Sequence, residues 1–208
     1  MIMNKIFIEA KDNKTSEYHF IETIIQTFFP DKEFTIIGID GIGNLFKEAI
    51  INQISLAQDT GEQAIVLVDA DTISKGYGYA KRKQDIERGM SENSISFPYF
   101  IYPNNSEDGD VENLMLKTAR RDLHHIFFDC FEDYEKCVSG LKDDNGEPVY
   151  NVPDLKGKLH TYMTAQKLPN RLKRQFGNGN WLFNEERYWN LNIAELEPLK
   201  DFFASNLK

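Results

Sequence analysis

Cysteine is scarce in this sequence, and long apolar runs are absent. The two cysteines, Cys130 and Cys137, lie seven positions apart in a helix-like stretch, where we expect them to share one helical face rather than form a disulfide. No zinc-type spacing of Cys and His is present. We therefore expect an intracellular, cytoplasmic protein. No run resembles a signal peptide or a membrane helix, so no membrane partner is expected.

Basic residues are also outnumbered by acidic ones. The chain of 208 residues has 24 Lys and Arg against 33 Asp and Glu, a formal net charge of −9 at pH 7. This balance argues against binding nucleic acid through overall charge, although a local basic surface can still do so. Hydrophobic residues make up 41% of the chain, which is enough for a substantial core. The length predicts one domain, or a core with an appendage.

Strands and helices alternate through the first half of the sequence. Short apolar runs predict the strands, and apolar residues at helical spacing predict the helices between them. The expected strands are 5–8, 34–39, 64–68 and 97–102, and the expected helices are 16–29, 45–57, 80–90 and 111–119. This order predicts an α/β fold, with a mostly parallel sheet of about four strands and helices on both faces.

After about residue 120 the alternation stops. Three helical segments and one polar, turn-rich loop are expected there: helices 121–141, 158–173 with an interruption at Pro169, and 193–207, and the loop 142–153. We therefore expect an α/β core over residues 1–120 and a helical C-terminal extension over residues 121–208 that packs on the core.

The apolar run 64–68 ends in two acidic residues, Asp69 and Asp71. A buried parallel strand delivers such residues to its C-terminal edge, where ligands bind in open α/β sheets. Two residues one position apart point to the same side of an extended chain. Their carboxylates repel each other unless a cation lies between them, and Mg²⁺ is the usual oxygen-bound ion. The alternative is that one of the two caps the following helix.

Acidic residues also follow two other strands. Glu9 ends the first strand, and Glu112 opens the helix after the fourth, behind Asp110. Asp110 or Glu112 can simply interact favourably with the positive end of the helix dipole. Glu112 can equally reach the same sheet edge. Because bunched like charges cost energy without a cation, three acidic strand ends favour a metal site.

The order of these motifs resembles the Toprim family, which joins a Glu ending the first strand to an Asp-x-Asp motif ending a later one. The matching residues are Glu9 and the pair Asp69 and Asp71. The segment 109–114, Gly-Asp-Val-Glu-Asn-Leu, is similar to the Gly-x-x-Glu-x-Leu element of a small Toprim-like family related to the OLD nucleases. The resemblance covers roughly residues 5–117. It departs at Ala10, where members usually have Gly, and at Asn13, where many have Asp.

The resemblance implies a Toprim-like, Rossmann-like fold and Mg²⁺-dependent phosphoryl transfer, with Mn²⁺ as a substitute ion. It implies acid–base chemistry or metal binding for Glu9, and metal binding for the Asp69–Asp71 pair, assisted by Glu112. In OLD nucleases a Lys from the C-terminal part of the Toprim region assists cleavage, and Lys156 and Lys158 match it by rough position. A solvated helical face is the alternative explanation for these two lysines.

Two glycine-containing turns are candidates for binding phosphate. Gly41 and Gly43 lie between the second strand and the second helix, where backbone N–H groups can cradle phosphate. Their order is not a dinucleotide fingerprint and no P-loop lysine follows, so a tight structural turn is the alternative. Lys75 lies in the loop after the aspartate pair. That loop can act as a lid whose lysine meets phosphate, or it can be an ordinary mobile loop.

Two functions from different classes fit these features. The first is a Mg²⁺-dependent enzyme acting on nucleic acid, DNA or RNA, most simply a nuclease that uses water. The second is a non-catalytic Toprim-like module that binds nucleic acid or a partner protein, or forms a homodimer, in a defence or repair system. A receiver domain is a third reading, but that fold has paired acids after the first strand, where Glu9 is single.

Overall fold

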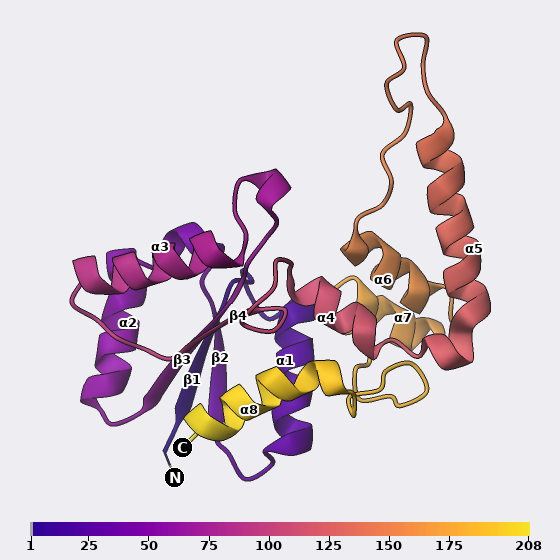
Figure 1. The fold of residues 1–208 in the computed structure, drawn as a ribbon. Coiled ribbons are helices and arrows are strands. Elements are labelled where there is room, and N and C mark those ends of the chain that lie inside the picture. The colour runs from indigo at the N-terminus through magenta and orange to yellow at the C-terminus, as the bar shows by residue number, and fades with distance from the viewer. Residues whose placement is uncertain (1) are drawn as a thin grey trace.

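A computed structural model of the chain describes residues 2–208. Its four strands are β1 (Asn4–Ile8), β2 (Phe34–Gly38), β3 (Gln63–Asp69) and β4 (Tyr99–Tyr102). They form one sheet in the order β2-β1-β3-β4, and every neighbouring pair is parallel (Figure 1). The predicted parallel α/β sheet is confirmed, and its arrangement is Rossmann-like.

Helices cover both faces of this sheet. On one face lie α2 (Glu48–Asp59) and α3 (Tyr79–Glu92), and on the other lie α1 (Ser16–Phe28), α4 (Val111–Thr118) and α8 (Glu197–Asn206) (Figure 1). Alternate strand residues enter opposite cores, because side chains alternate across a strand. In β1, Ile6 and Ile8 join the core under α1, whereas Phe7 joins the core under α2.

Helices follow Arg120, as predicted, namely α5 (Arg121–Gly140), α6 (Leu155–Thr164) and α7 (Asn170–Phe176), but the segments 141–154 and 177–193 are not helical. Pro169 caps α7, which is the predicted interruption. A short 3₁₀ helix, Ala194–Leu196, leads into α8. The C-terminal half of α5 and the loop after it project away from the rest of the molecule (Figure 1).

Both segments of the chain contribute to the larger hydrophobic core. Tyr162 of α6 and Trp189 belong to the same buried cluster as Ile6 of β1 and Phe20 of α1. The division of the chain near residue 120 stays a prediction, and the two segments are held together by shared apolar burial. This contact brings the start of α6 close to the sheet edge where the strands end.

The second helix begins later than its apolar spacing predicts. Residues Ile42–Asn44 form a 3₁₀ turn, and α2 starts at Glu48. The Asn44 side chain donates to the carbonyls of Ile39 (2.9 Å) and Asp40 (2.6 Å), which holds this turn in place. Local side-chain bonds of this kind compete with helix formation.

The cysteines and the hydropathy of the helices are two further features of the fold. Cys130 and Cys137 are free thiols on the exposed surface of α5. Within residues 2–208, no helix combines the length and the apolar character needed to cross a membrane.

Candidate active site

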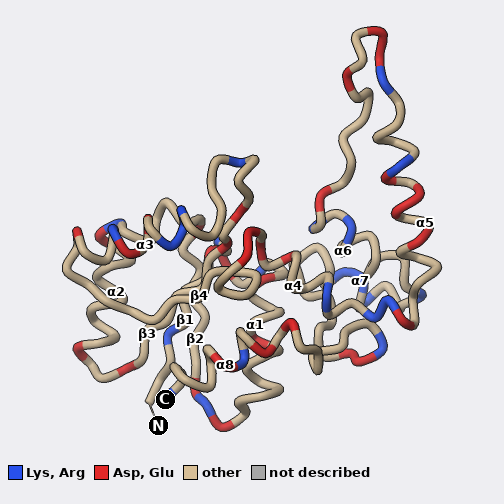
Figure 2. The backbone as a smooth tube through the Cα atoms, viewed as in Figure 1, with Lys and Arg blue, Asp and Glu red and all other residues tan. Residues whose placement is uncertain are grey.

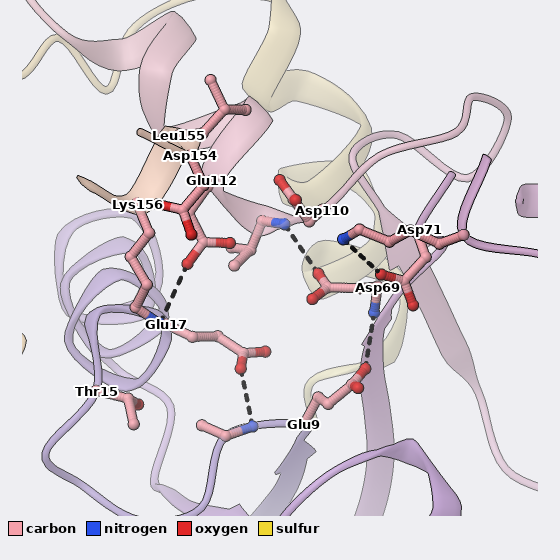
Figure 3. A pocket seen from close by; sticks show the side chains of 13 residues that line it. Glu9, Thr15, Glu17, Asp69, Asp71, Asp110, Glu112, Asp154, Leu155 and Lys156 are labelled. Carbon is pink, nitrogen blue, oxygen red and sulfur yellow. Dashed lines mark hydrogen bonds and ion pairs between the residues drawn. The ribbon is translucent and has the colours of Figure 1, made fainter. Parts of the chain in front are cut away.

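A cleft of about 320 Å³ lies where the strands end, and carboxylates dominate its walls (Figure 3). The acidic residues that line it are Glu9, Glu17, Asp69, Asp71, Asp110, Glu112 and Asp154. Two lysines, Lys75 and Lys156, also line the cleft. The structure therefore brings together all four acids that the sequence proposes as metal ligands. Figure 2 shows acidic segments meeting beside the start of α4, whereas α6 and α7 carry basic residues.

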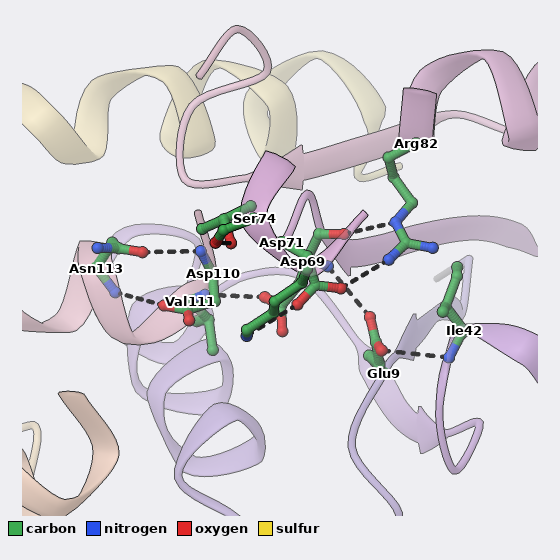
Figure 4. A network of polar contacts seen from close by, with 11 residues as sticks. Glu9, Ile42, Asp69, Asp71, Ser74, Arg82, Asp110, Val111 and Asn113 are labelled. Atoms are coloured by element: carbon green, nitrogen blue, oxygen red, sulfur yellow. Dashed lines mark hydrogen bonds and ion pairs between the residues drawn. The ribbon is translucent and has the colours of Figure 1, made fainter. Parts of the chain in front are cut away.

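Asp69 is the last residue of β3, and it contacts residues on two other elements of this site. Its Oδ1 accepts a hydrogen bond from the Val111 N–H at 2.8 Å, and its own N–H donates to Glu9 Oε2 at 3.2 Å (Figure 4). Burial raises the pKa of the Asp69 carboxyl well above its usual range, and the neighbouring carboxylates of Glu17, Glu9 and Glu112 add to the rise. Ionising Asp69 therefore calls for a nearby positive charge.

Asp71 has such a charge from the protein itself. Its Oδ2 lies 2.8 Å from the guanidinium of Arg82, and its Oδ1 lies 3.2 Å from Lys75 Nζ (Figure 4). Arg82 is buried, and its Nε also donates to the Asp69 carbonyl at 2.8 Å. The backbone at Asp71 has φ 58°, so the extended geometry expected for the aspartate pair ends at Asp69. The two carboxylates share the cleft but have different electrostatic partners.

The glycine-containing turn after β2 holds Glu9. The Gly41 N–H donates to the Glu9 carbonyl at 2.9 Å, and the Ile42 N–H donates to Glu9 Oε1 at 3.3 Å. Gly41 has φ 94°, a conformation that glycine adopts without strain. Gly43 lines a separate groove with Phe46 and does not reach the acidic cleft. These contacts favour the structural turn over the phosphate cradle.

Glu112 lies in the first turn of α4, two positions after the residue that caps the helix. Asp110 is that cap, and it forms a capping box with Asn113, so the helix-capping interpretation holds for Asp110. Glu112 Oε1 lies 3.4 Å from Lys156 Nζ. Burial raises the pKa of the Glu112 carboxyl, and the lysine partly counteracts this rise.

The two candidate lysines of α6 have different surroundings. Lys156 lines the cleft, and its side chain is 58% exposed, so a ligand can reach it beside its ion pair with Glu112. Lys158 is buried, and its Nζ lies 3.0 Å from Glu135 Oε2 on α5. The structure therefore places Lys156 in the site and Lys158 at a helix–helix contact outside it.

The sequence reasoning missed Glu17 and Arg82. Glu17 lies in the first turn of α1, and Arg82 lies near the start of α3. Each comes four positions before an isoleucine that is buried in the same helix, Ile21 and Ile86. That spacing puts a charged side chain on a buried helical face, and it is the signal that would have marked both residues.

The cleft suits a hard divalent cation in its donor chemistry. With the side chains in their present positions, residues 2–208 contain no group of three His, Cys, Asp or Glu residues arranged to hold a metal ion. Carboxylate oxygens are nevertheless the donors that Mg²⁺ prefers, and Asp69, Glu112 and Glu17 all have raised pKa values that a cation would lower. Binding would require rotation of these side chains toward a common point.

Comparison with known proteins gives a family without an assigned activity. No curated protein and no solved structure matches this chain. Residues 3–207 match a family described as protein of unknown function, DUF3226. Because the match covers nearly the entire chain, the protein belongs to the DUF3226 family.

Proposed function

We propose that this protein is a Mg²⁺-dependent phosphoryl-transfer enzyme that acts on nucleic acid, most simply a nuclease. The observation that carries the proposal is the gathering of Glu9, Asp69 and Glu112 in one cleft at the sheet edge. The Toprim-like order of the same residues supports it. A bound Mg²⁺ would offset the negative charge that develops on phosphate and orient the nucleophile.

Each cleft residue has a role that follows from its contacts. Asp69 and Glu112 are the proposed metal ligands, because burial makes their ionised forms dependent on a cation. Glu9 accepts backbone hydrogen bonds on both carboxylate oxygens, which orients it as a ligand or as a base toward water. Asp71 is a further ligand by resemblance, although it must exchange contacts with Arg82 and Lys75 to bind a metal.

The two lysines at the cleft supply positive charge for a phosphate. Lys156 extends from α6, and Lys75 from the loop after β3. Three more basic residues are exposed on α7 or just before it, namely Lys167, Arg171 and Arg174. A local surface of this kind can track a nucleic-acid backbone even though the whole chain is acidic.

Cleavage assays test the proposal. Purified protein is incubated with labelled single- and double-stranded DNA and RNA in the presence of Mg²⁺, Mn²⁺ or EDTA. We expect metal-dependent cleavage that Asp69→Asn reduces by a factor on the order of 100–1,000, as for loss of a group that stabilises transition-state charge. Asp201→Asn, on the exposed surface of α8, is the matched control. Cleavage that persists in Asp69→Asn would contradict the assignment.

A non-catalytic binding module is the second candidate, and the contacts of Asp71 favour it. Arg82 and Lys75 already balance the Asp71 carboxylate, and Asn13 stands where many Toprim-like proteins have Asp. This candidate predicts salt-dependent binding of nucleic acid, or binding of a partner protein, without turnover under any metal condition. Filter binding alongside the cleavage assay separates the two functions.

A further inference from the structure

Glu17 is a buried acid that none of the sequence motifs includes. It projects from the first turn of α1 into the acidic cleft, between Glu9 and Glu112 (Figure 3). The residue is only 8% exposed. Its Oε2 accepts a hydrogen bond from the Ala10 N–H at 2.9 Å, which fixes the direction of the carboxyl group.

The second oxygen of Glu17 is unsatisfied. Within the described residues, Oε1 is buried and has no hydrogen-bond partner. The hydroxyl of Tyr102, at the end of β4, is also buried without a partner. Burial raises the pKa of that hydroxyl, and Glu17 is the neighbouring carboxylate that adds most to the rise. Buried polar atoms are normally paired, so the unpaired Glu17 oxygen at the wall of the cleft is available to a bound ligand.

The surroundings of Glu17 define the chemistry of that ligand. Burial, assisted by the neighbouring carboxylates of Glu9 and Glu112, raises the pKa of Glu17 to about 8, although the hydrogen bond from Ala10 and the charge of Lys156 act in the opposite direction. The nearby cation is Lys156, whose Nζ lies 3.4 Å from Glu112. None of the described residues that line the cleft is His or Cys, so its donors are oxygens that suit Mg²⁺ or Mn²⁺.

We propose that Glu17 is a ligand of the divalent cation in this cleft, and that Oε1 is its donor atom. Glu112 and Asp69 complete the same wall and bind alongside it. The cation therefore lies toward α1 and α4, away from Asp71, whose charge Arg82 already balances. This inference rests on the proposed function only for the presence of a metal, and it holds whether or not the metal supports cleavage.

Direct titration with Mn²⁺ tests the inference. Free Mn²⁺ is followed by electron paramagnetic resonance, and Mg²⁺ is then added as a competitor. Glu17→Gln keeps the size of the side chain and an oxygen that can accept the Ala10 N–H. We expect it to weaken Mn²⁺ binding by about tenfold or more, in the range seen when support for a metal site is lost. Glu22→Gln, on the same helix and outside the cleft, is the matched control and leaves binding unchanged.

The conservative variant Glu17→Asp keeps the test usable if Glu17→Gln fails to fold. Circular dichroism establishes that each variant is folded, and Glu17→Asp retains the charge on a side chain one methylene shorter. If Glu17→Gln does not fold, weaker Mn²⁺ binding by folded Glu17→Asp supports the inference. Unchanged affinity in a folded Glu17 variant overturns it, because a protonated, structural carboxyl then explains the residue.

The outcomes also separate this inference from the proposed enzyme activity. If Mn²⁺ binding depends on Glu17 but the protein cleaves no nucleic acid, the assignment of Glu17 as a metal ligand is supported and the proposed nuclease activity is ruled out. If cleavage depends on the metal but Glu17→Gln binds Mn²⁺ as tightly as wild type, the nuclease activity is supported and the assignment of Glu17 as a ligand is ruled out. Absence of Mn²⁺ binding to the wild-type protein at millimolar concentrations overturns both.

Discussion

The two sides of the cleft balance their negative charge in different ways. On the side of α3, Asp71 faces Arg82 and Lys75 at hydrogen-bonding distance. On the side of α1 and α4, Glu17 and Glu112 have raised pKa values, which the exposed Lys156 only partly counteracts. The first side needs no external ligand, because Asp71, Arg82 and Lys75 balance one another's charge. The second side depends on protons or on an external cation, and it is the side to which the proposed function assigns the metal.

Removing the ion pair between Arg82 and Asp71 should have the largest effect on stability. Arg82→Met removes the ion pair with Asp71 and the hydrogen bond to the Asp69 carbonyl while keeping an apolar stem. We expect the free energy of unfolding to fall by about 3 kcal/mol, the lower end for breaking a buried pair, because Asp71 keeps some access to water. Urea denaturation measures the change.

Arg88→Met is the matched control for this experiment. Arg88 lies on the same helix, and it makes exposed pairs with Asp85 and Glu92. Exposed pairs contribute about 0–1 kcal/mol, so this variant should stay close to wild type. Equal losses in Arg82→Met and Arg88→Met would show that the Asp71 side is not a buried structural unit.

The two lysines of α6 sharpen the comparison on the side of α1 and α4. Lys156→Met removes the basic group beside Glu112, and we expect it to slow cleavage by about 10- to 100-fold if that lysine meets phosphate. Lys158→Met should leave the cleavage rate unchanged, because Lys158 is buried against Glu135 outside the cleft. Single-turnover rates with excess enzyme measure both. A slow Lys158→Met variant with normal stability would reverse the assignment.

The pH dependence of stability tests the charge state of Glu17. Its pKa is about 8 in the folded chain against an ordinary 4.5, so the folded chain retains a proton that the unfolded chain releases between those values. The stability from this group is fully present below about pH 4.5 and is lost as the pH rises through about 8. Asp69 and Glu112 shift in the same direction, and the Glu17 charge itself raises the pKa of Asp69, so the difference between variants measures Glu17 together with its effect on Asp69.

Glu17→Gln is neutral at every pH and should remove this loss. In EDTA, we expect it to match wild type near pH 4.5 and to exceed it near pH 8 by at least about 1 kcal/mol, since one pKa unit corresponds to about 1.4 kcal/mol. Urea denaturation at the two pH values gives the comparison. A variant that is less stable than wild type at the higher pH would mean that the Glu17 carboxylate is already compensated in the folded chain.

The sequence predicts the strand ends of this cleft better than its helical walls. Asp69 follows a five-residue apolar run, and the rule that ligands bind at the carboxyl ends of parallel strands places it at the cleft without further information. Glu9 follows from the same rule, whereas the sequence left open whether Glu112, in the first turn of α4, reaches the sheet edge or only suits the helix dipole. The departure of Asp71 from extended geometry could not be predicted, because it depends on pairing with Gly109 in a distant loop.

Charged residues on buried helical faces are the harder case. Glu17, Arg82 and Lys158 each precede a buried residue of the same helix by four positions, namely Ile21, Ile86 and Tyr162. Helical spacing alone therefore marks all three as buried. It does not say whether each faces the cleft, an aspartate beside the cleft or a neighbouring helix, because that depends on how α1, α3 and α6 pack.

Lys75 provides the smallest and most selective test of the comparison. Its side chain is 60% exposed and 3.2 Å from Asp71, so Lys75→Met should change the free energy of unfolding by less than about 0.5 kcal/mol. The lysine nevertheless competes with any cation for Asp71 Oδ1. Removing it should therefore strengthen Mn²⁺ binding by a few-fold if Asp71 can join the metal site, and leave it unchanged if Arg82 alone holds Asp71. Weaker Mn²⁺ binding would contradict both readings, since it would mean that Lys75 orders the site rather than blocks it.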